Sequence, residues 1–321
     1  MPSWFGDYNA LCFSACIPLP TCNLLINENL HASSSPSVLL SRCFLTGSSP
    51  IRDLGTTIAS ILGIIYIIHQ VLYKSHRMFR AVGRTEMSLL FLTYSCILLF
   101  QVFTIGGIIP RSRTFMVWTS AFHLGAIVCF FWTLIINALI LFQFVEDGTK
   151  RTVQARIFEL EITANNSNNN QQLHFLMSTV WTLYTLQFIV GTGIAWVAGV
   201  TFMSLDLAMD ITGHPHGISA AHFFLTLIFP AIAVLLYLVL VSILIFRKLD
   251  DYKSLIYVAL ALITFTISQV ILFGASSKIA AATHGRVNGS IFSTFFDLVS
   301  VALLYRFWNS ITDDTWGDHV F

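Results

Sequence analysis

Seven long apolar segments are the feature that most constrains how this chain can fold. The sequence has 321 residues with 17 lysines and arginines, and none of these cations lies in the interior of an apolar segment. A cation at the centre of a bilayer costs about 2.5–3.5 kcal/mol, so this exclusion is typical of membrane-spanning helices. The segments are Leu54–Tyr73, Met87–Ile109, Phe115–Phe144, Leu173–Phe202, Ala220–Phe246, Leu255–Ala275 and Val287–Trp308.

Each segment is near or above the roughly 20 residues that a helix needs to cross a hydrocarbon core of about 30 Å. Hydrophobic residues make up 55% of the chain and charged residues 10%, which is more apolar surface than a soluble domain can hide. The sequence therefore predicts an all-α, polytopic membrane protein with seven transmembrane helices, surrounded by the lipid bilayer. It divides into an N-terminal tail (1–53), a seven-helix bundle (54–308) and a short C-terminal tail (309–321). The net charge of +1 gives no reason to expect nucleic acid as a partner.

The basic residues predict the orientation of the chain, because lysine and arginine favour cytosolic loops. Eleven of the 17 lie in the odd-numbered loops and at the C-terminal end: Lys74, Arg77, Arg80, Arg84, Lys150, Arg151, Arg156, Arg247, Lys248, Lys253 and Arg306. The other six lie in the tail and the even-numbered loops: Arg42, Arg52, Arg111, Arg113, Lys278 and Arg286. This distribution predicts an N-terminus on the lumenal side and a cytosolic C-terminus.

Four cysteines are concentrated in the N-terminal tail: Cys12, Cys16, Cys22 and Cys43. The tail lies on the oxidising side in the predicted orientation, so the four are candidates for two disulfides, with three possible connectivities. A zinc site or free thiols are the alternatives. The spacing lacks the closing His or Cys pair that is typical of a structural zinc site, which favours disulfides.

Asp297 is the only acidic residue well inside an apolar segment. An ionisable group at this depth is costly in lipid, which makes it a candidate functional residue. Four further polar residues lie in the middle or non-cytosolic halves of their segments and are expected to meet it in the bundle interior: Gln101, His123, Gln187 and Gln269. One interpretation is a proton- or ligand-sensing cluster. The other is a protonated or hydrogen-bonded carboxyl that fixes helix register, with His123 a hydrogen-bonded core residue.

Three other patterns concern local structure. Ala59 and Gly63 are four residues apart, a spacing that lets two membrane helices approach closely. Pro230 predicts a kink, because its ring excludes one backbone hydrogen bond. Asn288-Gly289-Ser290 matches a glycosylation acceptor but lies too close to the last predicted helix to be a good one.

The usual signatures of enzymes and cofactor sites are not found in the sequence. It has no paired histidines at helical spacing, no Gly-x-Ser-x-Gly and no glycine-rich phosphate loop. The histidines at 214, 216 and 222 form a Gly/Pro-rich loop without metal-ligand spacing. We therefore expect no cofactor and no catalysis. A membrane hydrolase with His123, His222 and Asp297 around a metal is a more remote alternative.

Four short motifs, in order along the chain, resemble the fungal chitin synthase export chaperone family. They are Pro18-Leu19-Pro20-Thr21-Cys22 with the later Arg42-Cys43, Val82-Gly83-Arg84-Thr85-Glu86, Glu146-Asp147-Gly148-Thr149, and Tyr305-Arg306-Phe307-Trp308 with Thr312-Asp313-Asp314. The resemblance covers nearly the whole chain. It implies an endoplasmic reticulum membrane protein that helps a chitin synthase fold and leave that compartment. An Asn-rich insert, a shorter acidic tail and extra tail cysteines depart from the family pattern, so a related membrane protein is an alternative client.

The motifs also suggest site residues. Gly83, Arg84, Glu86, Glu146, Asp147 and Gly148 are placed at the cytosolic ends of the first three predicted helices, where the charged ones can form ion pairs. Asp313-Asp314 and Val320-Phe321 resemble export signals that vesicle coat proteins recognise. A seven-helix receptor or sensor with a ligand pocket around Asp297 is the alternative function.

Overall fold

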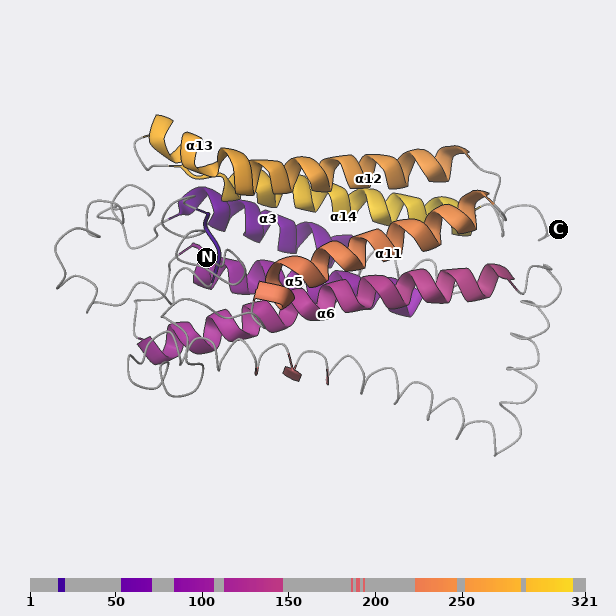
Figure 1. Ribbon diagram of the computed structural model, residues 1–321, viewed down its shortest axis with the longest axis horizontal. Coiled ribbons are helices and arrows are strands. Elements are labelled where there is room, and N and C mark those ends of the chain that lie inside the picture. Colours follow the sequence, from indigo (N-terminus) through magenta and orange to yellow (C-terminus); the bar gives the residue numbers. More distant parts are fainter. Residues whose placement is uncertain are drawn as a thin grey trace, which may run out of the picture.

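The computed structural model describes residues 17–20, 53–70, 84–106, 113–146, 186, 189–190, 193, 223–246, 252–283 and 287–313. Within these ranges the regular elements are helices and no strand occurs, as the sequence predicted. The elements are α3 (Leu54–His69), α5 (Arg84–Thr104), α6 (Arg113–Glu146), η4 (Phe224–Ile228), α11 (Phe229–Leu244), α12 (Tyr252–Val270), η6 (Ile271–Ala275), α13 (Ser276–Ala282) and α14 (Ser290–Asp313). The long helices lie side by side along the long axis of the molecule (Figure 1).

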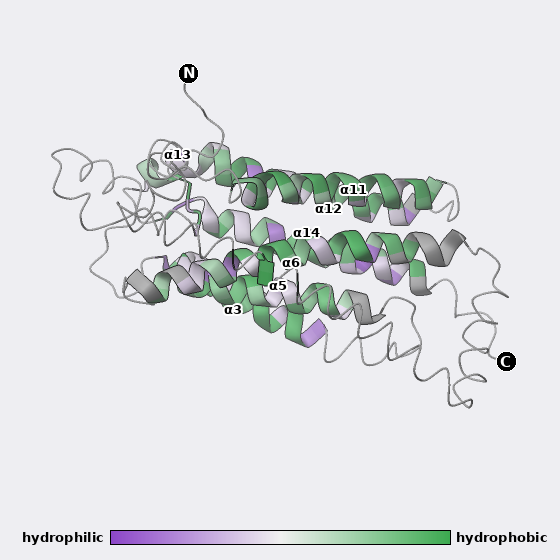
Figure 2. Ribbon diagram, turned by 60° about the horizontal axis from the view of Figure 1, so that its bottom comes forward, coloured by the Kyte–Doolittle hydropathy of each residue, from purple (hydrophilic) through white to green (hydrophobic). Residues whose placement is uncertain are grey.

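Five described helices are long and apolar enough to cross a membrane: Met87–Thr104, Trp118–Leu139, Phe224–Leu244, Lys253–Ala282 and Ser290–Ile311. They correspond to five of the seven predicted segments, and apolar residues dominate them in Figure 2. The first predicted segment forms α3, a shorter apolar helix of 16 residues. Most of the fourth segment lies outside the described residues, as does nearly all of the N-terminal tail. The seven spans therefore stay a prediction.

α3 shows why such a chain folds with its polar side inwards. Its buried residues are small or polar apart from Ile67: Thr56, Thr57, Ser60, Gly63 and Ile67. Apart from His69 at its end, its exposed residues are large and aliphatic, among them Leu54, Ile58, Leu62 and Ile65. A lipid environment explains this arrangement, because an exposed leucine costs nothing in lipid while an unpaired hydroxyl does.

The described helices pack in an open ring. α11 packs against α6, α6 against α5, α5 against α3, α3 against α14, and α14 against α12. Within this set, α11 and α12 do not pack along each other, although they are consecutive in the chain. The ring is therefore closed by helix packing everywhere except between α11 and α12.

At one end of the helix bundle, the hydrophobic core contains the family motif Tyr305-Arg306-Phe307-Trp308. Tyr305, Phe307 and Trp308 are all buried, whereas Arg306 between them is exposed. The Tyr305 ring lies 5.6 Å from that of Phe91 and 5.8 Å from that of Trp308, measured between ring centroids. Aromatic contacts of this kind stabilise helix packing, so this motif is part of the core.

The described helices contain two irregularities, one beside the proline that the sequence singled out and one that the sequence did not predict. A π-helical turn, η4, ends directly before α11, where Pro230 occupies the first turn. This turn accommodates the proline, which cannot donate the usual backbone hydrogen bond. The apolar segment predicted to end at Ala275 continues as helix to Ala282, so Lys278 lies on α13 instead of in the predicted loop.

Gly63 allows a close approach of three helices, as its spacing with Ala59 predicted. A Cβ atom at Gly63 would lie 2.8 Å from Leu98 Cδ1 on α5 and 3.5 Å from Leu298 Cδ1 on α14. The end of the Leu98 side chain would have to move to admit a Cβ atom here. Gly63 therefore lets α3 settle against both neighbours.

Candidate functional site

A row of polar residues runs along one face of α14. Its members are spaced three or four residues apart, the spacing that places side chains on one side of a helix. They are Ser290, Ser293, Thr294, Asp297 and Ser300. All but Asp297 are buried, and Asp297 is half-buried. Sequence reasoning singled out Asp297 alone, although the same spacing was available to identify the whole row.

This row joins α14 to two neighbouring helices through hydrogen bonds. Gln101 of α5 donates from Nε2 to Thr294 Oγ1 at 2.6 Å. On the α12 side, the Ser268 and Ser293 hydroxyl oxygens lie 2.8 Å apart, and Ser300 Oγ donates to the Ala261 carbonyl at 2.8 Å. Hydrogen bonds between membrane helices are worth about 0.6 kcal/mol each on average, so the row holds α14 in a defined register.

Asp53 connects the first turn of α3 to the start of the same row. Its side chain is 3% exposed, and its Oδ1 accepts a hydrogen bond from the Thr56 backbone N–H at 3.0 Å. Its Oδ2 accepts from Thr56 Oγ1 at 2.7 Å and from Ser290 Oγ at 2.9 Å. Sequence reasoning missed this residue. An aspartate immediately before an apolar run is a helix N-cap signal that identifies it.

Asn288 begins α14 in a similar way. Its Oδ1 accepts a hydrogen bond from the Ser290 backbone N–H at 3.0 Å, and it shares the single proton of the Ser290 hydroxyl with Asp53 Oδ2. The Asn288 side chain is buried. A buried amide engaged in capping is a poor acceptor for a glycan, in line with the expectation from its sequence position.

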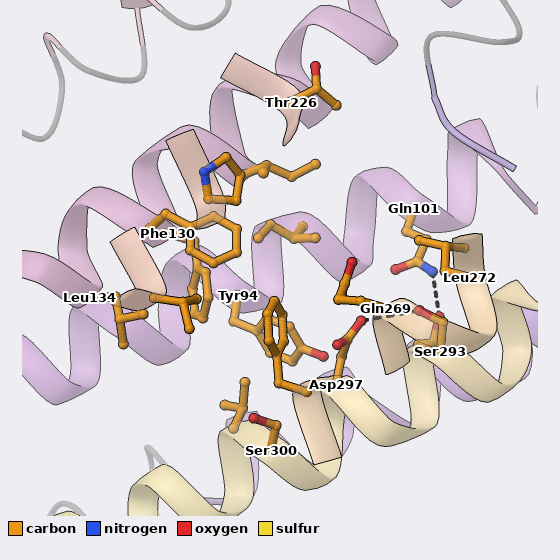
Figure 3. Close-up of a pocket in the computed structure, with 18 of the residues that line it drawn as sticks. Tyr94, Gln101, Phe130, Leu134, Thr226, Gln269, Leu272, Ser293, Asp297 and Ser300 are labelled. Atoms are coloured by element: carbon orange, nitrogen blue, oxygen red, sulfur yellow. Dashed lines mark hydrogen bonds between the residues drawn. The ribbon is translucent and has the colours of Figure 1, made fainter. Parts of the chain in front are cut away.

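Asp297 is incompletely hydrogen-bonded. Its Oδ2 accepts a long bond of 3.5 Å from Ser293 Oγ. Its Oδ1 is buried and has no hydrogen-bond partner among the described residues, and the same holds for the hydroxyl of Tyr94. A buried polar atom without a partner costs about 1–3 kcal/mol. Figure 3 shows Tyr94 and Asp297 close together on the wall of one cavity.

That cavity has a volume of about 240 Å³ and is partly open. Its walls are mainly aromatic and aliphatic, with residues from α5, α6, α11, α12 and α14 (Figure 3). Four of the five polar residues that sequence reasoning grouped together line it: Gln101, His123, Gln269 and Asp297. The fifth, Gln187, lies outside the described residues. The helices thus bring these four together around one space.

His123 is held by a hydrogen bond to Thr104, since His123 Nδ1 and Thr104 Oγ1 lie 2.9 Å apart. Thr104 Oγ1 also lies 2.8 Å from the Phe100 carbonyl oxygen, and which partner donates in the His123–Thr104 contact depends on the histidine tautomer. His123 is 3% exposed. It is a buried, hydrogen-bonded histidine, as one interpretation of the sequence held.

One part of the N-terminal tail reaches the cavity. Pro18, Leu19 and Pro20, from the first family motif, line the cavity. Ile17 and Leu19 are buried, and Ser120 Oγ of α6 donates to the Pro20 carbonyl at 3.4 Å. The motif therefore contacts the helix bundle and contributes to the cavity wall.

Several predicted site residues cannot be placed. Outside the described residues lie Cys12, Cys16, Cys22, Cys43, Gly83, Asp147, Gly148, Asp314, Val320 and Phe321. Four others lie at helix ends, Arg84 at the start of α5, Glu146 at the end of α6, Asp313 at the end of α14, and Glu86 in the first turn of α5. The ion pairs, disulfides and export signals stay predictions.

The metal alternatives find no site in the part of the chain that the structure describes. There, no group of three or more His, Cys, Asp or Glu side chains is close enough to hold a metal ion. His222, which the hydrolase alternative requires, lies outside the described ranges.

Comparison with known proteins identifies the family. The family model described as chitin synthase export chaperone matches residues 4–164 and 176–321, which is nearly the whole chain. This chain belongs to that family. The family resemblance predicted from the four motifs is thereby confirmed.

Curated relatives share the same description. A chitin synthase export chaperone of Cryptococcus neoformans is 27% identical over 311 residues, covering 97% of this chain and 75% of the relative. Those of Emericella nidulans and Debaryomyces hansenii are 26% and 23% identical and cover 83% and 90% of the relatives. No solved structure matches the chain. Membership of the chitin synthase export chaperone family gives no support to the receptor alternative.

Proposed function

We propose that this protein is a membrane chaperone that helps a chitin synthase fold and leave the endoplasmic reticulum, and so supports chitin synthesis in the cell wall. The observation that carries the proposal is the family match over residues 4–164 and 176–321. Relatives described as chitin synthase export chaperones also align with 97% of the chain. The role is non-enzymatic, and it needs no cofactor.

The described helices suit such a role. Their outer faces are apolar, and their polar groups gather on the inner face of α14 and around the cavity. A chitin synthase with many membrane helices carries polar groups that are costly in lipid until it is fully assembled. A bundle with hydrogen-bonding groups at membrane depth shields such groups without nucleotide or metal.

The remaining sequence predictions complete the proposal. The protein resides in the endoplasmic reticulum membrane with a lumenal N-terminus and a cytosolic C-terminus. Charged residues of the cytosolic motifs, such as Arg84 and Asp147, pair at the helix ends. The tail cysteines form disulfides in the lumen, and Asp313-Asp314 and Val320-Phe321 recruit vesicle coat proteins.

Deletion of the gene tests the function. We expect a fluorescently tagged chitin synthase to accumulate in the endoplasmic reticulum and cell-wall chitin to fall, and the full-length chain to restore both. A second polytopic plasma membrane protein with an unrelated function serves as the control and should still reach the cell surface. Normal export of every chitin synthase in the deletion strain would contradict the proposal.

A further inference from the structure

α11 and α12 both line the cavity but do not pack along each other among the described residues. α11 contributes Pro230, Val234 and Leu238 to the cavity wall, and α12 contributes residues that include Phe265 and Gln269. The two helices do not pack along each other in the described structure, and they are the least buried of the five candidate spans. The side of the cavity between α11 and α12 is therefore the one that packing among the described helices leaves uncovered.

The acidic group of the cavity has one oxygen to which no described residue donates a hydrogen bond. Asp297 Oδ1 is buried without a partner among the described residues, and the walls around it are mainly apolar. A partner for this oxygen must donate an N–H or O–H group and must carry it on an apolar stem. The volume of about 240 Å³ is below the roughly 300–1,000 Å³ of pockets for drug-sized ligands. It suits one long side chain better than a whole lipid.

We propose that one transmembrane helix of the client docks along α11 and α12 and inserts a hydrogen-bond-donating side chain between them to Asp297. The proposal rests on the chaperone function and specifies where that function is performed. A basic side chain in the centre of a bilayer is costly. Pairing with Asp297 removes much of that cost until the client forms its own contacts. The exposed aliphatic faces of α11 and α12, which include Leu235 and Ile263, supply the surface on which the client helix lies.

Site-specific photo-crosslinking in native membranes locates the docked helix. A photoreactive amino acid is placed at Leu235 of α11 or Thr266 of α12, which are exposed and directly follow the cavity-lining Val234 and Phe265. Matched controls carry it at Leu62 of α3 and Leu92 of α5, which are 59% and 54% exposed on other helices of the ring. We expect adducts with chitin synthase at 235 and 266 at least fivefold above those at 62 and 92.

Other outcomes would contradict docking at α11 and α12 but would not contradict the chaperone function. Equal or stronger chitin synthase adducts at 62 and 92 place the client elsewhere on the ring. Adducts at 235 and 266 that contain only lipid or a second copy of this chain show that lipid or that copy, and not the client, lies along α11 and α12. Absence of chitin synthase adducts at 235 and 266 likewise excludes docking here, provided that deletion of the gene blocks export. The chaperone function itself is overturned only if every chitin synthase is exported normally in the deletion strain.

Substitution of Asp297 tests the donor pairing. Asp297→Leu removes the acceptor and should lower the adduct yield at 235 about tenfold, whereas Asp297→Asn keeps an acceptor oxygen and should stay within about threefold of the wild type. Wild-type adduct yield from an Asp297→Leu protein present at normal levels would exclude the pairing.

A second pair of variants leaves the polar row intact, in case Asp297→Leu fails to fold. Val234→Trp fills the cavity from α11, whereas Ile232→Trp, two residues away, lies on an exposed position that does not line the cavity. We expect only Val234→Trp to reduce crosslinking and surface delivery of the synthase. Equal effects of both variants would contradict insertion into the cavity.

Discussion

Two aspartates show how single polar residues act in this molecule. The carboxylate of Asp53 accepts hydrogen bonds from the backbone and side chain of Thr56 and from Ser290, so one side chain caps α3 and connects it to α14. Asp297 lies on the same polar face of α14 with one oxygen unpartnered among the described residues. Of these two aspartates, one has its hydrogen bonds satisfied by the fold, and the other has an acceptor to offer.

Replacement of Asp53 by alanine should destabilise the protein. The variant loses the N-cap of α3 and the hydrogen bond that connects α3 to Ser290, at a cost of about 1–2 kcal/mol. Thermal unfolding of the purified protein in detergent measures the effect. Leu54→Ala is the matched control, because Leu54 is the next residue and is exposed, and it should change stability little. Equal destabilisation by both variants would contradict the capping role.

Among elements, the contact of η6 and α13 with the start of α14 depends on a residue without a side chain. A Cβ atom at Gly289 would lie 3.0 Å from Ser276 Cα and 3.1 Å from the Ile271 carbonyl oxygen. Both are backbone atoms, which cannot rotate away as the end of a side chain can. The Gly289 backbone N–H also donates to Ser276 Oγ at 3.2 Å, which ties the two segments together.

Gly289→Ala should therefore destabilise the protein by about 1–3 kcal/mol, the usual cost of overpacking. Gly274→Ala is the control, since a Cβ atom there meets nothing within 4 Å and alanine is favoured over glycine in a helix. It should be neutral or stabilising. Unfolding in a denaturing detergent series compares the two variants, and an unaffected Gly289→Ala protein would show that this contact is looser than described.

Elements were well predicted from the sequence where hydropathy decides, and poorly where packing decides. The predicted segments Met87–Ile109 and Phe115–Phe144 overlap α5 and α6, because lipid selects apolar stretches of helical length. The continuation of helix to Ala282 was not predicted. Its residues, including Lys278, are too polar to belong to an apolar segment, but their backbone continues the helix.

For the whole molecule, the distribution of basic residues predicts that the two termini lie on opposite sides of the membrane, which requires an odd number of spans. Glycosylation acceptor tags appended to either end test this. We expect the N-terminal tag to be glycosylated in the lumen and the C-terminal tag to stay unmodified. Modification of both tags would contradict the count of seven, and modification of the C-terminal tag alone would contradict the predicted orientation.

The candidate site was only half visible in the sequence. Asp297 was identified because a carboxyl group among apolar residues is conspicuous, and Gln101, His123 and Gln269 because they share its depth. Ser293, Thr294 and Ser300 escaped notice, since serine and threonine are common in membrane helices and their role depends on which helix faces them. The contribution of Pro18–Pro20 to the cavity wall was equally unforeseen, because it arises from a contact between distant parts of the chain.

The amino-acid sequence by itself determined that this chain is helical, suited to the membrane and a member of its family. Those properties follow from local composition and from motifs, because a backbone in lipid must satisfy its own hydrogen bonds and exclude cations. Only the tertiary structure decided that α11 and α12 stay apart, that four polar residues share one cavity, and that Asp297 keeps an unpartnered oxygen among the described residues. These depend on the shapes of facing side chains, which hydropathy along a single chain does not record.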